Sequence, residues 1–165
     1  MSKAIKKISI IIPVYNEKKT INTVLEQVNN LDFSSLNLEK QIIVVDDGSI
    51  DGTREILKEF KIKNSKLKII FHERNMGKGE ALRTGLKAAT GEIVAIQDAD
   101  LEYDPNELIR LVKPILNRDS EIVYGSRFLR NNPVIYRRYA WGNKFLSFVI
   151  GFLYGVRITD AYTCY

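Results

Sequence analysis

The strand expected at residues 92–97 constrains this chain most, because its apolar residues follow one another without the polar alternation of a half-exposed strand. Such uninterrupted runs are typical of strands covered on both faces, as in a parallel sheet. The run ends in two carboxylates, Asp98 and Asp100, separated by one residue. In open α/β sheets, ligands bind beyond the carboxyl ends of the strands. We therefore expect both acids at the edge of the sheet where a ligand binds.

The spacing of Asp98 and Asp100 suits a metal ion. Residues i and i+2 of an extended segment project to the same side, so both carboxylates can address one cation. Two oxygen ligands from one short segment favour Mg²⁺ or Mn²⁺, which retain waters and take further ligands from substrate phosphates. The alternative is that both acids are turn residues before a helix, where Asp is common.

Expected strands and helices alternate along residues 8–124. Amphipathic helical patterns separate five apolar strand segments, expected at residues 8–12, 41–45, 67–71, 92–97 and 121–124. Four consecutive strand–helix alternations predict an α/β fold: a Rossmann-like, mostly parallel sheet with helices on both faces. The 165 residues fit one domain.

The composition says more about the cellular compartment and the kinds of site to exclude than about the binding partner. The net charge of +5 and the pI near 9.2 favour an anionic partner. The single cysteine excludes an internal disulfide and a zinc motif, and the single histidine argues against a His-based metal site. We expect His72, Trp141 and Cys164 to be packing residues. No apolar run approaches the length of a bilayer span, and no signal-peptide core follows the basic N-terminus, so we expect a cytoplasmic chain.

Polar clusters follow four of the expected strands. They lie at residues 15–17, at Asp46 and Asp47, at residues 74–78, and at Asp98 and Asp100. A shared sheet edge would gather at least four carboxylates, which repel one another unless a cation, a base N–H or ribose hydroxyls relieve the charge. Lys78 and Arg127 supply the positive charge that a diphosphate requires. The clusters predict a site for a nucleotide joined to another group through a diphosphate.

Two common glycine-rich phosphate motifs are missing from the sequence. Residues 13–17 stand where G-x-G-x-x-G would follow the first strand of a dinucleotide fold, and residues 77–79 lack the first glycine and the Ser/Thr of a P-loop. A nucleotidyltransferase would carry a Gly-rich, basic loop directly after the first strand, so this class is disfavoured as well.

Several segments, in this order and spacing, resemble the family 2 glycosyltransferases with the GT-A fold, particularly the polyprenyl-phosphate (dolichol-phosphate) mannosyl- and glucosyltransferases. The similar segments are residues 10–17, 44–49, 75–79, 98–101 and 125–127, and a later stretch at 137–165 resembles the lipid-phosphate branch. The resemblance implies that Pro13, Tyr15 and Glu17 line the base and ribose, and that Asp47 accepts a hydrogen bond from a base N–H. Their structural alternatives are a strand terminator (Pro13), a rim aromatic (Tyr15), and a turn with a helix cap (Asp47).

The resemblance also implies how the phosphates and the metal are held. Asp98 would lie near the ribose and the metal, Asp100 would be the main ligand of Mg²⁺ or Mn²⁺, and Ala99 between them would contact the nucleotide sugar. Glu102 would lie near the sugar. Three cations would face the diphosphate or the acceptor phosphate: Lys78, Arg127 and Arg137. Lys78 and Arg137 can equally be solvated surface charges.

The implied reaction is the inverting transfer of a hexose from a UDP- or GDP-sugar to a polyprenyl (dolichyl or undecaprenyl) phosphate, with Asp98, Asp100 and Arg127 as the catalytic residues. A sugar hydroxyl as acceptor would require a general base, for which Asp160 is a candidate, whereas a phosphate monoester is already anionic. This difference favours the phosphate. The alternatives are transfer to a saccharide hydroxyl, and a sugar-nucleotide-binding fragment without turnover. We expect no nucleic-acid partner.

The last third of the chain predicts a change of role. We expect a nucleotide-sugar-binding core at residues 1–128, and at 129–165 the truncated start of an acceptor and membrane-proximal segment of the same domain. Basic residues precede an apolar run, and a helix at 144–156 would suit peripheral contact with the cytoplasmic face of a membrane. The alternative is a core helix packed under the sheet.

Overall fold

A parallel sheet with flanking helices forms the body of the protein. The computed structural model describes residues 5–64, 67–126, 137–155 and 158–160, and of these it leaves out the side chains of residue 63 and residues 137–141. The strands are β1 (Lys7–Val14), β2 (Glu39–Asp46), β3 (Lys68–Phe71) and β4 (Ile93–Ile96). The α-helices are α1 (Ile21–Asn30), α2 (Thr53–Lys63), α3 (Lys78–Ala88), α4 (Glu107–Leu116) and α5 (Arg137–Tyr154), and a 3₁₀ turn covers Ser34–Leu36.

The strands pair in the order β3-β2-β1-β4, and every pairing is parallel. Val14 lies opposite Asp46, and Asp46 lies opposite Phe71, so β1, β2 and β3 end at one level. β4 ends lower, with Ile96 opposite Ile11. The residues after β4 therefore pass alongside the end of β1. The predicted α/β fold with a parallel sheet is confirmed.

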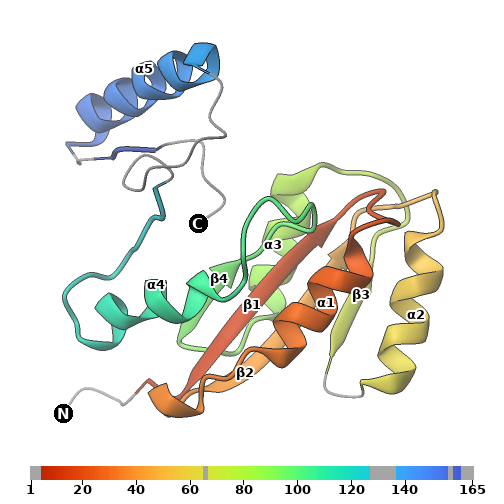
Figure 1. The fold of residues 1–165 in the computed structure, drawn as a ribbon. Coiled ribbons are helices and arrows are strands. Elements are labelled where there is room, and N and C mark those ends of the chain that lie inside the picture. The colour runs from red at the N-terminus through yellow and green to blue at the C-terminus, as the bar shows by residue number, and fades with distance from the viewer. Residues whose placement is uncertain (1–4, 65–66, 127–136, 156–157, 161–165) are drawn as a thin grey trace.

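Helices cover both faces of the sheet, as predicted (Figure 1). Even-numbered residues of β1, from Ile8 to Val14, belong to one large core that also contains apolar residues of α1, α2 and α4. On the other face, Ile43 and Val45 of β2 pack with Ala81 of α3. Because successive side chains of a strand point to opposite faces, an unbroken apolar run is what a sheet covered on both faces requires.

The strand expected at residues 121–124 is not formed. Its prediction rested on the β-branched and aromatic residues there, but β-propensity describes the fit of a side chain to a pleated, paired surface. No described strand pairs with this segment, and Ile122 and Tyr124 are 68% and 62% exposed. Local propensity without a pairing partner leaves the segment irregular.

The apolar run after Lys144 forms most of α5, which does not pack under the sheet (Figure 1). Phe145, Phe148 and Phe152 are 70–80% exposed, whereas Asn143 and Ser147 on another side of the helix are buried. The core-helix alternative is therefore wrong. No helix in the described part of the chain has the length and hydropathy needed to cross a bilayer.

Close contact between α3 and β1 gives a test of this packing. A Cβ at Gly85 would lie 2.4 Å from Cγ2 of Ile11, whereas a Cβ at Gly79 of the same helix would meet no heavy atom within 4 Å. We expect Gly85→Ala to lower the free energy of unfolding by about 1–3 kcal/mol through overpacking. The control Gly79→Ala should leave stability unchanged or raise it by up to about 1 kcal/mol, because Ala is the better helix former. Urea denaturation measures both, and equal stability of the two variants would contradict the packing.

Candidate functional site

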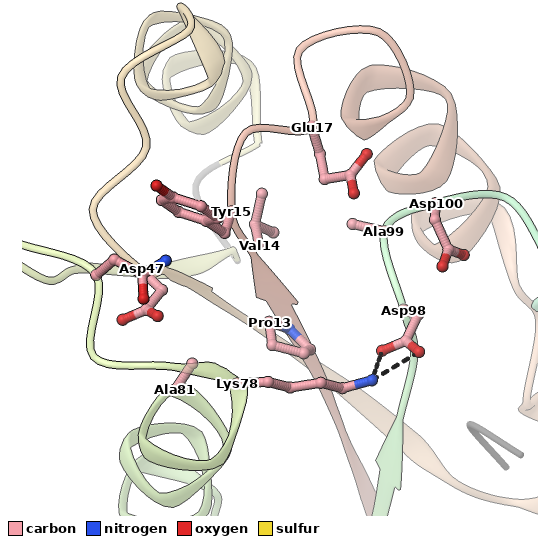
Figure 2. A pocket seen from close by; sticks show the side chains of 11 residues that line it. Pro13, Val14, Tyr15, Glu17, Asp47, Lys78, Ala81, Asp98, Ala99 and Asp100 are labelled. Carbon is pink, nitrogen blue, oxygen red and sulfur yellow. Dashed lines mark hydrogen bonds and ion pairs between the residues drawn. The ribbon is translucent and has the colours of Figure 1, made fainter. Parts of the chain in front are cut away.

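A cavity of about 280 Å³ opens at the carboxyl ends of β1, β2 and β4 (Figure 2). Its lining includes eight residues predicted from the sequence: Pro13, Tyr15, Glu17, Asp47, Lys78, Asp98, Ala99 and Asp100. Three further lining residues were not among the predicted ones: Val14, Asn75 and Ala81. Glu102 is exposed and does not line the cavity. Arg127 and the side chain of Arg137 lie outside the described residues.

Asp47 forms one wall of the cavity and is almost completely buried. Its Oδ1 accepts hydrogen bonds from the Met76 N–H at 3.0 Å and from the ring of His72 at 2.7 Å, and its Oδ2 accepts one from the Gly77 N–H at 2.7 Å. Burial raises the pKa of the Asp47 carboxyl, but these three hydrogen bonds outweigh it and hold the pKa below its ordinary value. Asp47 is therefore an ionised acceptor that also fixes the segment before α3.

His72 is buried as predicted, but it is more than a packing residue. It follows β3, and its backbone N–H donates to the carbonyl of Asp46 at 2.8 Å. Its Nδ1 contacts Asp47, and its Nε2 lies 3.0 Å from the hydroxyl of Thr84 on α3. Sequence reasoning missed this role because the two partners of the ring lie 25 and 12 residues away along the chain.

Asp98 and Asp100 lie on the other wall of the cavity, across from Asp47 (Figure 2). Both oxygens of Asp98 contact Nζ of Lys78, at 2.6 and 2.7 Å. Oδ1 of Asp100 accepts a hydrogen bond from the backbone N–H of Glu102 at 3.0 Å, within a turn in which Leu101 has a φ of 65°. The turn alternative thus describes part of the role of Asp100, although its carboxylate still lines the cavity.

A buried glutamine holds this acidic turn. The side chain of Gln97 has no exposed surface, and its Nε2 donates to the backbone carbonyls of Asp98 at 3.1 Å and Tyr103 at 3.4 Å. The sequence placed Gln97 at the end of a strand and gave no sign of these bonds. They fix the path of the backbone between β4 and α4.

The loop after β1 is tied to the loop after β2. The N–H of Asn16 donates to the hydroxyl of Ser49 at 2.9 Å, the N–H of Ile50 donates to Oδ1 of Asn16 at 2.9 Å, and the N–H of Glu17 donates to the hydroxyl of Thr53 at 3.0 Å. Asn16 has a left-handed φ of 56°, and α1 begins only at Ile21. These hydrogen bonds between the two loops position Tyr15 and Glu17 at the cavity.

The donor set fits a divalent ion that shares its ligands with a phosphate. Among the residues that the structure describes, no three His, Cys, Asp or Glu side chains gather to hold a metal by themselves. Asp98 and Asp100 supply two carboxylates in one cavity, and Mg²⁺ commonly uses one or two carboxylates with substrate phosphates and water. These two residues could hold Mg²⁺ or Mn²⁺ once a phosphate ligand is present.

Comparison with known proteins shows that this chain is similar to sugar transferases. Residues 9–164 match the model of the family described as "Glycosyl transferase family 2". The UDP-N-acetylglucosamine–dolichyl-phosphate N-acetylglucosaminyltransferase of Methanococcus voltae is 36% identical over 94% of this chain and 66% of that protein. The dolichol-phosphate mannosyltransferase of Pyrococcus furiosus is 35% identical over 78% of this chain and 35% of that protein. The chain thus spans between about a third and two thirds of the length of these relatives.

Solved structures agree on the fold. The mannosyltransferase PcManGT from Pyrobaculum calidifontis, in complex with GDP-Man and Mn²⁺, matches with a TM-score of 0.57 and 30% identity over 68% of this chain and 32% of that one. TarS 1–349 of S. aureus in complex with UDP-GlcNAc matches with a TM-score of 0.56 and 32% identity over 68% of this chain and 31% of that one. The predicted GT-A architecture is confirmed.

The bonds to Asp47 predict a pH-dependent contribution to stability. Because its pKa is lowered in the folded protein, the contribution is complete above the pKa of the unfolded chain and disappears as the pH falls through the lower folded value. At pH 7 we expect Asp47→Asn to lower the free energy of unfolding by about 1–3 kcal/mol. In acid the difference from the parent protein should shrink. Denaturant titrations at pH 7 and in acid measure this difference in the free energy of unfolding, with the exposed Asp119→Asn as control. A difference in acid as large as that at pH 7 would contradict the prediction.

Proposed function

The chain belongs to glycosyl transferase family 2, and from this membership we propose that it is a metal-dependent, inverting hexosyltransferase. The donor would be a UDP- or GDP-sugar and the acceptor a polyprenyl phosphate. The observation that carries the proposal is the cavity at the strand ends, where Asp47 faces Asp98 and Asp100 across a space lined by Lys78. In this division of labour, residues 1–128 bind the donor and residues 129–165 begin the acceptor segment.

Asp47 would recognise the base. Two carboxylate oxygens offer about four acceptor positions, and described groups use three of them. Oδ2 accepts only the Gly77 N–H among these, so it can take one further hydrogen bond from the ring N–H of uracil or guanine. Pro13, Tyr15 and Glu17, which line the same cavity, would enclose the base and ribose. This acceptor suits both bases, which is why the proposal names UDP and GDP together.

Asp98 and Asp100 would hold Mg²⁺ or Mn²⁺ together with the diphosphate. The bound ion would neutralise the charge that grows on the diphosphate as the sugar departs. Lys78 now pairs with Asp98, and this pair is partly exposed, with the lysine 56% accessible. Exposed ion pairs contribute only about 0–1 kcal/mol, so Lys78 can exchange Asp98 for a phosphate oxygen. Arg127 would add a second cation there.

The state of the candidate general base after β4 supports a phosphate acceptor rather than a sugar hydroxyl. A hydroxyl needs a general base, and Asp160, the candidate for it, is 1% exposed and accepts a hydrogen bond from Nδ2 of Asn143 at 2.5 Å. An anionic phosphate oxygen could attack the anomeric carbon without proton removal, from the face opposite the departing diphosphate. The relatives named above act on dolichyl or dolichol phosphate by name, which supports the same acceptor class.

We also propose that α5 touches the membrane that carries such a lipid. Its exposed apolar side chains are Phe145, Leu146, Phe148, Phe152, Leu153 and Tyr154. Amphipathic helices with aromatic residues bury one side in the headgroup region, and a neighbouring cation such as Lys144 adds attraction to anionic lipids. The contact would be peripheral, at the cytoplasmic face.

Nucleotide binding tests the metal site. We expect the protein to bind UDP or GDP at least about tenfold more tightly with Mn²⁺ than without divalent ions, a typical size for coupling between two ligands. Asp100→Ala should remove this difference while leaving the metal-free affinity unchanged, because Asp100 acts through the ion. Isothermal titration calorimetry measures both, with Asp119→Ala as a matched control outside the cavity. Undiminished metal dependence in Asp100→Ala would refute its role.

Turnover tests the acceptor and the membrane contact. With polyprenyl phosphate in anionic vesicles and a panel of nucleotide sugars, we expect sugar transfer to the lipid. Phe148→Ser should reduce transfer and vesicle co-sedimentation without changing nucleotide affinity, while the control Ile62→Ser, 84% exposed on α2, should change neither. Transfer to a saccharide hydroxyl alone would favour the alternative acceptor. Nucleotide binding without any turnover would favour a binding fragment.

A further inference from the structure

The imidazole of His72 connects the cavity wall to α3. One ring nitrogen lies 2.7 Å from Oδ1 of Asp47, and the other lies 3.0 Å from the hydroxyl of Thr84. The residue is 8% exposed and does not itself line the cavity. Its backbone is also held, since its N–H donates to the carbonyl of Asp46 and its carbonyl accepts from the guanidinium of Arg54. The ring thus has a fixed position and a partner on each side.

The partners of the ring determine which nitrogen carries the hydrogen. Asp47 is ionised near neutral pH, because its pKa is lowered, and an ionised carboxylate only accepts hydrogen bonds. Nδ1 of His72 must therefore donate. In the neutral ring Nε2 is then an acceptor, and the hydroxyl of Thr84 can donate to it. In this row of hydrogen bonds from Thr84 through His72 to Asp47, each donor therefore faces an acceptor.

The hydrogen bonds that link Thr84, His72 and Asp47 fix the direction of the open acceptor position of Asp47. Oδ1 is occupied by His72 and Met76, and Oδ2 by Gly77, so the carboxylate cannot rotate without breaking these bonds. Met76 and Gly77 lie in the segment that Asp47 itself holds, whereas His72 follows a strand of the sheet. The ring is therefore the contact that ties the carboxylate to the rigid part of the fold.

We propose that His72 is a positioning residue for the nucleotide base, holding the Asp47 carboxylate through Nδ1 while Thr84 holds the ring through Nε2. This rests on the proposed role of Asp47 at the base. His72 touches neither the diphosphate nor the sugar in this arrangement. Its loss should weaken recognition of the base and leave recognition of a bare diphosphate intact, whereas a general loss of structure would weaken both.

Two substitutions separate the two ring nitrogens. The amide of Asn in His72→Asn reaches about the place of Nδ1 and can still donate to Asp47. The longer His72→Gln places its amide near Nε2 and leaves Asp47 without that donor. Thr84→Val removes the hydroxyl that holds the ring and keeps the β-branched shape. Thermal denaturation monitors folding of all three variants.

Calorimetry with Mn²⁺ tests the proposal, using UDP, GDP and inorganic pyrophosphate as ligands. We expect His72→Gln to bind the preferred nucleoside diphosphate about tenfold more weakly, the scale of one lost hydrogen bond to a charged group, with unchanged affinity for pyrophosphate. His72→Asn should stay within about threefold of the parent protein, and Thr84→Val should fall between the two. Unchanged nucleotide affinity in His72→Gln, or an equal loss for pyrophosphate, would overturn the proposal.

Nitrogen-15 NMR of the His72 ring in the unliganded protein provides an independent test. The expected result for the neutral ring is a protonated Nδ1 and an unprotonated Nε2; the opposite tautomer would overturn the proposal. If the parent protein binds pyrophosphate but neither nucleotide, Asp47 does not recognise a base, and both the proposed base site and the role of His72 fall. If it binds nucleotide and His72→Gln matches it, only the role of His72 falls.

Discussion

Parallel pairing through β1 brings the ends of three neighbouring strands to one edge of the sheet, and the cavity depends on that pairing. β1, β2 and β3 end at one level, at Val14, Asp46 and Phe71. On the other side of β1, the N–H of Gln97 after β4 donates to the carbonyl of Ile11 and continues the hydrogen-bond ladder. Asp47 follows β2 and Asp98 follows β4, and the two acids meet across the cavity only because both strands pair with β1, one on each side of it, in this register. A slip by one residue would turn every side chain of a strand to the opposite face. The apolar cores on both faces prevent such a slip.

The two walls of the cavity are held with different strength. Asp47 is buried and bound by three donors, so its carboxylate is organised before any ligand arrives. Asp98 is held by Lys78, whose side chain is more than half exposed, and such a pair is easily exchanged. This asymmetry fits the proposed ligand. A base can be recognised by a fixed acceptor, whereas a diphosphate with its metal needs charged groups that can change partners.

Much of the fold and part of the site could be predicted from the sequence, because the information is local. The apolar run at Ile93–Ile96 correctly indicates a strand, and the acids that follow it lie at the strand end. Val94 is 40% exposed, however, because β4 is an edge strand of the described sheet, so the prediction that this strand is covered on both faces is wrong. Pairing is not local. The segment at 121–124 has the residues of a strand but no partner, and His72 meets Asp47 only through the pairing of β2 with β3. The sequence likewise shows that Lys78 is charged, but not that it binds Asp98.

The position of the metal and the diphosphate is the most direct test of the proposed site. Crystals soaked with Mn²⁺ and UDP or GDP would locate the ion by anomalous scattering and the nucleotide by difference density. We predict a manganese peak on the carboxylates of Asp98 and Asp100 that also contacts the diphosphate, with the base at Asp47. A nucleotide bound elsewhere, or manganese that leaves these two carboxylates without contact, would contradict the proposed site.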